Sequence, residues 1–148
     1  MTSELDTSLR VELYREFLRS GAAPSAVRLA ELVGLPLKEV RESLERLAAG
    51  RAIALQPESR EIMFAAPLSA VPTPYVVRVS GRPFFAPCIW DALGVIAMVK
   101  QDTAVETSCP CCGEAMTLAV RGGKPDTSVG IVHFGLPAKH WWENIVFT

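Results

Sequence analysis

A thiol and a carboxylate lie three residues apart in the apolar stretch FFAPCIWDALG, at Cys88 and Asp91. Pro87 suits the first position of a helix, which puts Cys88 in its first turn, where backbone N–H groups and the helix dipole favour thiolate over thiol. We therefore expect a lowered pKa at Cys88 and the fastest alkylation of the four thiols. Asp91 would lie on the same face, within reach of the sulfur. Such a pair can be a nucleophile or soft-metal ligand with a proton source, or a structural cysteine beside a carboxylate that stabilises the dipole.

The segment ETSCPCCGEAM contains the other three cysteines, Cys109, Cys111 and Cys112. Because no export signal is visible, we expect thiols or metal ligands rather than disulfides. Cys109 and Cys112 have the C-x-x-C spacing of half a zinc knuckle, which would need Cys88, His133 or His140 as further ligands. A second C-x-x-C is missing, so a structural zinc is not the favoured interpretation. Soft-metal binding and a structural turn with spare thiols both stay open.

Residues 1–66 are predicted to form an N-terminal unit of three helices and a hairpin. Apolar residues recur at helical spacing between Leu9 and Leu47. A glycine stands where each helix would end, at Gly21, Gly34 and Gly50. The segments AIALQ and EIMFA alternate like two strands around the turn PESR. This order is typical of a winged helix, with residues 29–47 as its helix-turn-helix.

Residues 67–148 are predicted to form a small mixed α/β core, so the fold class of the whole chain is α+β. We expect a strand over Tyr75–Val79 and a helix over about residues 88–100. TLAVRGG and VGIVHFGLP resemble strands, and the second would hold His133 in the core or at a sheet edge. HWW, His140 to Trp142, is interpreted as the start of an amphipathic helix packed on the core.

Composition and charge limit the partners of the chain. A net charge of −1 over 148 residues creates no global field toward nucleic acid or a membrane surface. The sequence contains no run of about 18 apolar residues that could span a bilayer, and its start lacks a signal-peptide pattern. A cytoplasmic location is therefore expected. The predicted recognition helix has equal numbers of basic and acidic residues, which predicts only weak, non-specific DNA binding. These residues are Lys38, Arg41 and Arg46 against Glu39, Glu42 and Glu45.

The segments AVPTPYVV and GRPFFAPCIWDALG, and the later LP before an aromatic-rich end, resemble the alkylmercury (organomercurial) lyase family. That family has a small winged-helix-like N-terminal part followed by a mixed core. Its active site has a Cys-x-x-Asp motif at the start of a helix, and Cys88-Ile89-Trp90-Asp91 matches that motif in spacing. The resemblance covers most of the chain.

The resemblance implies protonolysis of a carbon–mercury bond, with a small organomercury compound or its thiol adduct as substrate. Cys88 would be the thiolate that takes mercury, and Asp91 would mediate proton delivery to the carbon. Hg²⁺ would remain as the bound product, and no cofactor would be required. The family's second mercury-binding cysteine corresponds in position to Thr148, which implies a truncated chain or a replacement thiol at Cys111 or Cys112. Cys109 corresponds to a further, mainly structural cysteine of the family.

Two other functions stay open at this point. One is a non-catalytic soft-metal binding protein that uses Cys88 together with the thiols of residues 109–112. The other is a winged-helix regulator whose thiols sense a metal or an oxidant. No oligomeric state is predicted.

Overall fold

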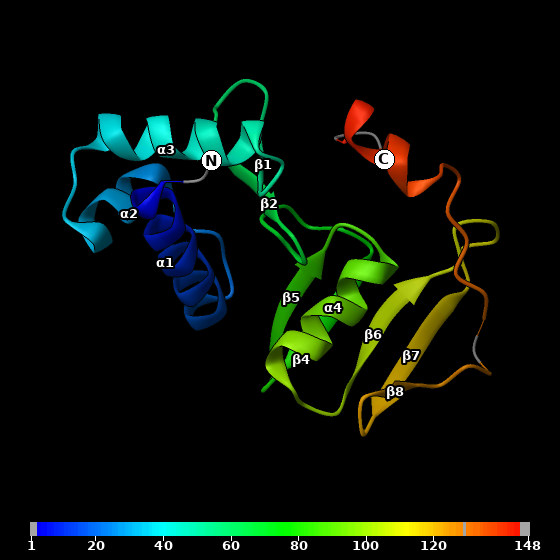
Figure 1. Cartoon of the computed structure of the whole chain (residues 1–148). Coiled ribbons are helices and arrows are strands. Elements are labelled where there is room, and N and C mark those ends of the chain that lie inside the picture. The colour runs from blue at the N-terminus through cyan, green and yellow to red at the C-terminus, as the bar shows by residue number, and fades with distance from the viewer. Residues whose placement is uncertain (1–2, 129, 146–148) are drawn as a thin grey trace.

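The computed structural model describes residues 3–128 and 130–145. Its N-terminal part contains the three predicted helices, α1 (Glu4–Ser20), α2 (Ala26–Val33) and α3 (Leu37–Ala49). Gly21 and Gly34 end the first two helices in the left-handed conformation, with φ of 82° and 68°, where a residue with a Cβ is disfavoured. In Figure 1 these helices form a bundle beside the sheet.

The remaining elements are short strands, one further α-helix and a 3₁₀ helix. In chain order they are β1 (Ala54–Leu55), β2 (Ile62–Ala65), β3 (Leu68–Ser69), β4 (Tyr75–Val79), β5 (Arg82–Ala86), α4 (Ile89–Val99), β6 (Thr103–Ser108), β7 (Ala115–Arg121), β8 (Lys124–Pro125) and η1 (Ala138–Glu143). The predicted hairpin is confirmed, since β1 pairs with β2 in antiparallel register. The strand predicted over Tyr75–Val79 is confirmed as β4, and the predicted helix over residues 88–100 as α4.

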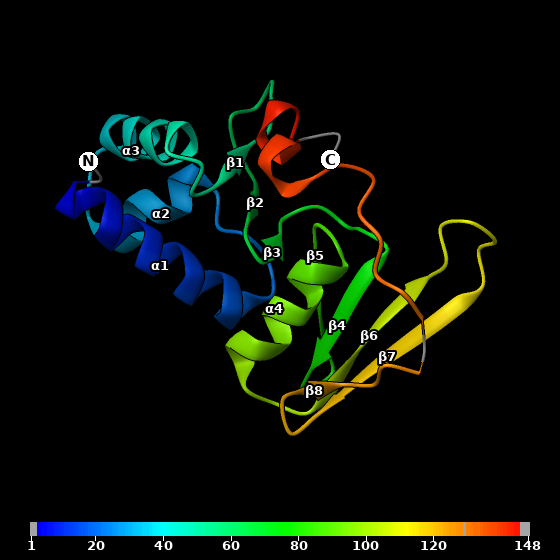
Figure 2. The same cartoon turned by 45° about the vertical axis from the view of Figure 1, so that its right-hand side comes forward.

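The strands of the described residues form one antiparallel sheet in the order β1-β2-β3-β5-β4-β6-β7-β8. Helix α4 crosses one face of this sheet and contacts β4, β5 and β6 (Figures 1 and 2). The sheet continues across the predicted boundary at residue 66, because β2 pairs with β3. One hydrophobic cluster likewise extends from Leu9 of α1 to Val120 of β7. The division into 1–66 and 67–148 therefore stays a prediction.

The strand predicted in VGIVHFGLP is wrong for its described part, residues 130–137, which are irregular and exposed; Val129 lies outside the described residues. Beyond β7 the sheet continues only with the short β8, which pairs with Val120 and Arg121, and residues 130–137 pair with no strand of the described residues. His133 is exposed rather than packed in the core or at a sheet edge. Side chains of this run line a cavity instead.

The aromatic segment HWW also differs from its prediction. It forms the 3₁₀ helix η1 instead of the start of an amphipathic α-helix. The ring of Trp142 nevertheless contacts the buried Phe64 of β2, with ring centroids 6.2 Å apart. This contact holds η1 beside the hairpin, as Figure 2 shows.

The buried carboxylate of Asp6 joins α1 to α3. Its Oδ1 accepts hydrogen bonds from Ser43 Oγ at 2.6 Å and from Arg46 Nη2 at 2.7 Å, and its Oδ2 accepts one from the Ser3 N–H at 3.1 Å. Asp6 is only 1% exposed, so these donors replace the water it would otherwise bind. The Arg46 guanidinium, which outweighs burial, holds the pKa of this carboxyl well below its usual range.

We expect Asp6→Ala to lower the free energy of unfolding by about 3 kcal/mol, because buried Ser43 and the Arg46 charge lose their partner. The folded-state pKa is depressed, so the stabilisation is present above the unfolded value of about 4 and is lost as the pH falls below it. Urea unfolding at pH 7 and near pH 2.5 measures both effects.

The control is Glu12→Ala, which removes an ion pair of 3.4 Å to the largely exposed Arg15 and should change stability by less than about 0.5 kcal/mol. An Asp6→Ala effect of equal size at both pH values would contradict the assignment.

Candidate active site

Cys88 is the N-cap residue of α4, in an extended conformation with φ of −149° and ψ of 178°. The prediction that Pro87 opens the helix and puts Cys88 in its first turn is therefore off by two positions, since the first helical residue is Ile89. Cys88 Sγ accepts a hydrogen bond from the Asp91 N–H at 3.5 Å, and its thiol donates to Asp91 Oδ2 at 3.2 Å. The predicted contact between the thiol and the carboxylate is confirmed.

The pKa of Cys88 is shifted in the direction opposite to the prediction. Burial raises the pKa of the Cys88 thiol to about 11, and the neighbouring Asp91 carboxylate adds to the increase. The N–H groups of Asp91 and Trp90 lower the Cys88 pKa, but by less. Burial also raises the pKa of Asp91, which the Cys88 thiol opposes. The expected lowered pKa at Cys88 is wrong, because loss of water outweighs the helix N-terminus. Near neutral pH Cys88 is therefore a thiol, hydrogen-bonded to the Asp91 carboxyl group.

Cys88 and Asp91 line a cavity of about 370 Å³. Its walls come from the end of β2, the start of α4, the irregular run before η1, and η1 itself. Several aromatic side chains line the cavity, namely Phe64, Trp90, Phe134, Trp141 and Trp142. The thiol and the carboxyl thus lie against an apolar space that can accept an organic group.

Aromatic contacts hold the C-terminal wall of this cavity in place. Trp141 Nε1 donates a hydrogen bond to the Leu136 carbonyl at 2.9 Å. Its ring lies 5.1 Å from that of Phe134, centroid to centroid. Core packing was the favoured interpretation of HWW over the lining of a pocket, and the structure places Trp141 and Trp142 in a wall of this cavity. A signal was present in the sequence, since Phe134, Trp141 and Trp142 fall within nine consecutive positions.

Tyr14 of α1 is a second residue that sequence analysis missed. Its hydroxyl donates to the Ala66 carbonyl at 2.7 Å, and Ala66 lines the same cavity. Burial raises the pKa of Tyr14, which the charge of Arg10 opposes and that of Asp91 reinforces. The N-terminal helix therefore reaches the wall of the site. No sequence motif marks Tyr14, since its partner is a backbone group 52 positions away.

The other cysteines lie on the turn between β6 and β7, with Cys111 and Cys112 exposed. Backbone N–H groups of Cys112 and Cys111, followed by the Cys112 thiol, lower the pKa of Cys109. Within residues 3–128 and 130–145, no three His, Cys, Asp or Glu side chains gather closely enough to hold a metal ion. The structure therefore does not join these thiols to Cys88. His140 Nδ1 instead lies 2.6 Å from Glu143 Oε1.

Three basic residues on or near α3 lie close to carboxylates. Arg46 pairs with Asp6, Arg60 with Glu45, and Lys38 lies 3.9 Å from Glu42. Cations already neutralised in this way contribute little to phosphate binding, which is consistent with the predicted weak DNA binding. In the described part of the chain, no helix has the length and apolar character needed to cross a membrane.

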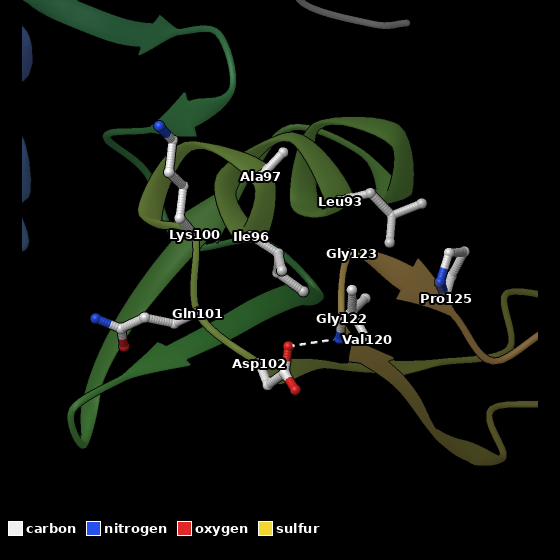
Figure 3. A pocket seen from close by; sticks show the side chains of 10 residues that line it. All are labelled: Leu93, Ile96, Ala97, Lys100, Gln101, Asp102, Val120, Gly122, Gly123 and Pro125. Atoms are coloured by element: carbon white, nitrogen blue, oxygen red, sulfur yellow. Dashed lines mark hydrogen bonds between the residues drawn. The ribbon is translucent and has the colours of Figure 1, made fainter.

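A second cavity of about 430 Å³ lies at the other end of α4, against the turn after β7 (Figure 3). Ile96, Leu93 and Val120 form apolar parts of its lining. Its carboxylate, Asp102, accepts a hydrogen bond from the Gly122 N–H at 2.7 Å. No cysteine is among the described residues that line it, so we place the candidate site at Cys88.

Comparisons with known proteins relate the chain to one family. The family model described as alkylmercury lyase matches residues 68–148. Alkylmercury lyases of Bacillus cereus and Staphylococcus epidermidis are each 26% identical, over 116 and 122 residues, which is 78% and 80% of this chain. These matches cover 50% and 53% of the two relatives, so the chain spans about half the length of the curated relatives it matches.

A solved structure described as the mercury-bound form of MerB2 shares the fold, with a TM-score of 0.66. Its sequence is 24% identical, and the match covers 84% of this chain and 60% of that one.

Alkylation of the four free thiols over a pH series tests the electrostatics of the site. We expect iodoacetamide to modify Cys109 before Cys88 near neutral pH, with Cys88 reacting as the pH approaches about 11. Asp91→Asn removes the carboxylate that raises the Cys88 pKa, so the Cys88 midpoint should fall by about one pH unit. Mass mapping of the modified peptides gives each midpoint.

Asp102→Asn is the matched control, because Asp102 lies in the cavity at the other end of α4 and should leave the Cys88 midpoint unchanged. Identical midpoints in the unmodified chain and in Asp91→Asn would show that the carboxylate does not act on this thiol.

Proposed function

This chain belongs to the alkylmercury lyase family, and from that premise we propose that it cleaves the carbon–mercury bond of organomercury compounds at Cys88 and Asp91. Family membership supports an organomercurial-lyase-like function. The observation that supports the residue assignment is the 3.2 Å contact between the Cys88 thiol and the Asp91 carboxylate inside an apolar cavity. Because the chain spans about half of its curated relatives, the activity of the whole protein is part of the proposal.

The proposed reaction begins with a thiol adduct of the organomercury compound, R–Hg–SR′. Mercury is soft and prefers sulfur, so Cys88 Sγ bonds to it and gives up its proton to the adjoining Asp91 carboxylate. Asp91 then delivers this proton to the carbon as the Hg–C bond breaks. The balance is R–Hg–SR′ + Cys88–SH → R–H + Cys88–S–Hg–SR′, and Asp91 ends as it began.

The second sulfur on mercury is proposed to come from the substrate adduct. Two thiolates push more electron density onto the carbon than one does. The described residues bring no third metal-binding side chain to Cys88 and Asp91, which argues against Cys111 or Cys112 in this role. Thr148, the position that corresponds to the family's second cysteine, lies outside the described residues.

The N-terminal unit is proposed to be a winged-helix-like support for the site rather than a reader of DNA. Tyr14 joins α1 to the cavity wall at Ala66, whereas Lys38, Arg46 and Arg60 lie close to carboxylates. Weak, non-specific DNA binding stays a prediction for this unit.

The hydrocarbon product tests the proposed function. Methylmercury supplied as its cysteine adduct should yield methane slowly from the unmodified chain, since Cys88 is the one protein thiolate on the metal. Cys88→Ser should reduce the methane to the uncatalysed background, because the hydroxyl is a poor ligand for mercury. Headspace gas analysis measures the rate.

Cys111→Ser is the matched control, since it removes an exposed thiol and should keep the full rate. Stoichiometric binding of organomercury without any methane would favour the non-catalytic soft-metal binding function instead.

The aromatic walls predict a preference for aryl groups. Trp141→Leu should lower kcat/KM for phenylmercury by about tenfold, because it loses a ring contact of about 1.4 kcal/mol, and should change methylmercury turnover by less than about threefold. Trp141→Phe keeps an aromatic ring and should retain most of the preference. Equal losses for both substrates in Trp141→Leu would mean that the ring supports the wall without contacting the organic group.

A further inference from the structure

The turn between β6 and β7 is closed by two backbone hydrogen bonds. The Cys109 N–H donates to the Glu114 carbonyl and the Gly113 N–H donates to the Cys109 carbonyl, both at 2.8 Å. Gly113 has φ of 76°, the left-handed conformation that lets the chain reverse here. Figure 2 shows this turn, in yellow, projecting beyond the end of the sheet. Its backbone therefore has a defined shape at an accessible place.

This shape brings two of the three sulfurs of the turn together. Cys112 lies inside the turn that these two hydrogen bonds close, and its N–H and thiol lower the pKa of Cys109. Cys112 is exposed and Cys109 partly so, hence a solute can reach both sulfurs. For Cys111, in contrast, the interaction with Cys109 is through its backbone N–H. The C-x-x-C spacing on this closed turn makes Cys109 and Cys112 the chelating pair, with Cys111 outside it.

We infer that Cys109 and Cys112 form a two-thiolate binding site for a soft cation of the Hg²⁺ type, separate from Cys88. Binding forms two metal–sulfur bonds and releases two protons: Hg²⁺ + 2 R–SH → Hg(SR)₂ + 2 H⁺. Thiolate sulfur favours soft ions, and Hg²⁺ is satisfied by two such ligands. Zn²⁺ requires four, and the described residues supply no group of three metal-binding side chains. The site therefore favours Hg²⁺ over Zn²⁺ because of the number of ligands that each ion requires.

The turn adjoins the Cys88 site without being part of it. Pro110, between the two sulfurs, lines a cavity of about 200 Å³ together with Ile89 and His133. Ile89 follows Cys88 in the chain, and His133 also lines the cavity of Cys88. An experiment on the turn must therefore remove the Cys88 thiol, which also makes its result independent of any carbon–mercury cleavage.

The test uses the full chain carrying Cys88→Ser, titrated with Hg²⁺ and analysed by native mass spectrometry. We expect one Hg²⁺ on each monomeric chain, retained against a tenfold excess of free cysteine. Adding Cys109→Ser or Cys112→Ser should weaken binding on the order of 100-fold, since the second sulfur no longer binds intramolecularly. Adding Cys111→Ser should have no effect. Zn²⁺ should not be retained under the same competition.

Protection from alkylation gives a second measurement on the same Cys88→Ser chain. With Hg²⁺ bound, Cys109 and Cys112 should resist iodoacetamide while Cys111 reacts. Strong binding that survives Cys109→Ser, binding that is lost with Cys111→Ser, or equal retention of Zn²⁺ would each overturn the two-thiolate site. None of these outcomes depends on whether Cys88 and Asp91 cleave organomercury.

Discussion

The hydrogen bond from the Cys88 thiol to the Asp91 carboxylate is the interaction on which the proposed chemistry depends. The same sulfur also caps α4 by accepting the Asp91 N–H, so one short segment starts the helix and holds the reactive pair. Strand β5, paired along its length with β4, leads the chain to this point. Helix α4 then packs across β4, β5 and β6, which fixes the orientation of its first turn. The sheet and α4 thus together fix the position of Cys88 and Asp91.

Burial of the pair decides how it can react. A helix N-terminus stabilises a thiolate, but here loss of water and the adjoining carboxylate outweigh that effect and keep the proton on Cys88. A thiol in this state is a poor general nucleophile. It can still exchange its proton for a soft metal, because the metal–sulfur bond replaces the S–H bond while Asp91 accepts the proton. The site is therefore suited to a thiophilic substrate, and its thiol reacts slowly with alkylating agents near neutral pH. Cys109, on an accessible turn, has the opposite properties.

The local features of the fold could be predicted from the sequence, and the long-range ones could not. Helical periodicity and glycine positions predicted α1, α2 and α3, and the Cys-x-x-Asp spacing predicted the contact between Cys88 and Asp91. The prediction of a lowered pKa at Cys88 was wrong because this pKa depends on burial by segments distant in the sequence. The strand predicted in the run before η1 was wrong because apolar side chains of this run face a cavity rather than a neighbouring strand. Tyr14 and Trp141 join the site through tertiary contacts that no spacing rule encodes.

The most direct test of the central claim is an intact-mass time course after loading one equivalent of phenylmercury onto the Asp91→Asn variant. The account predicts that the unmodified chain loses the phenyl group and keeps mercury on Cys88. The variant should keep both phenyl and mercury, since it binds through the same thiol but lacks the group that carries the proton to carbon. Loss of the phenyl group from Asp91→Asn at the rate of the unmodified chain would contradict the role of the Cys88–Asp91 pair.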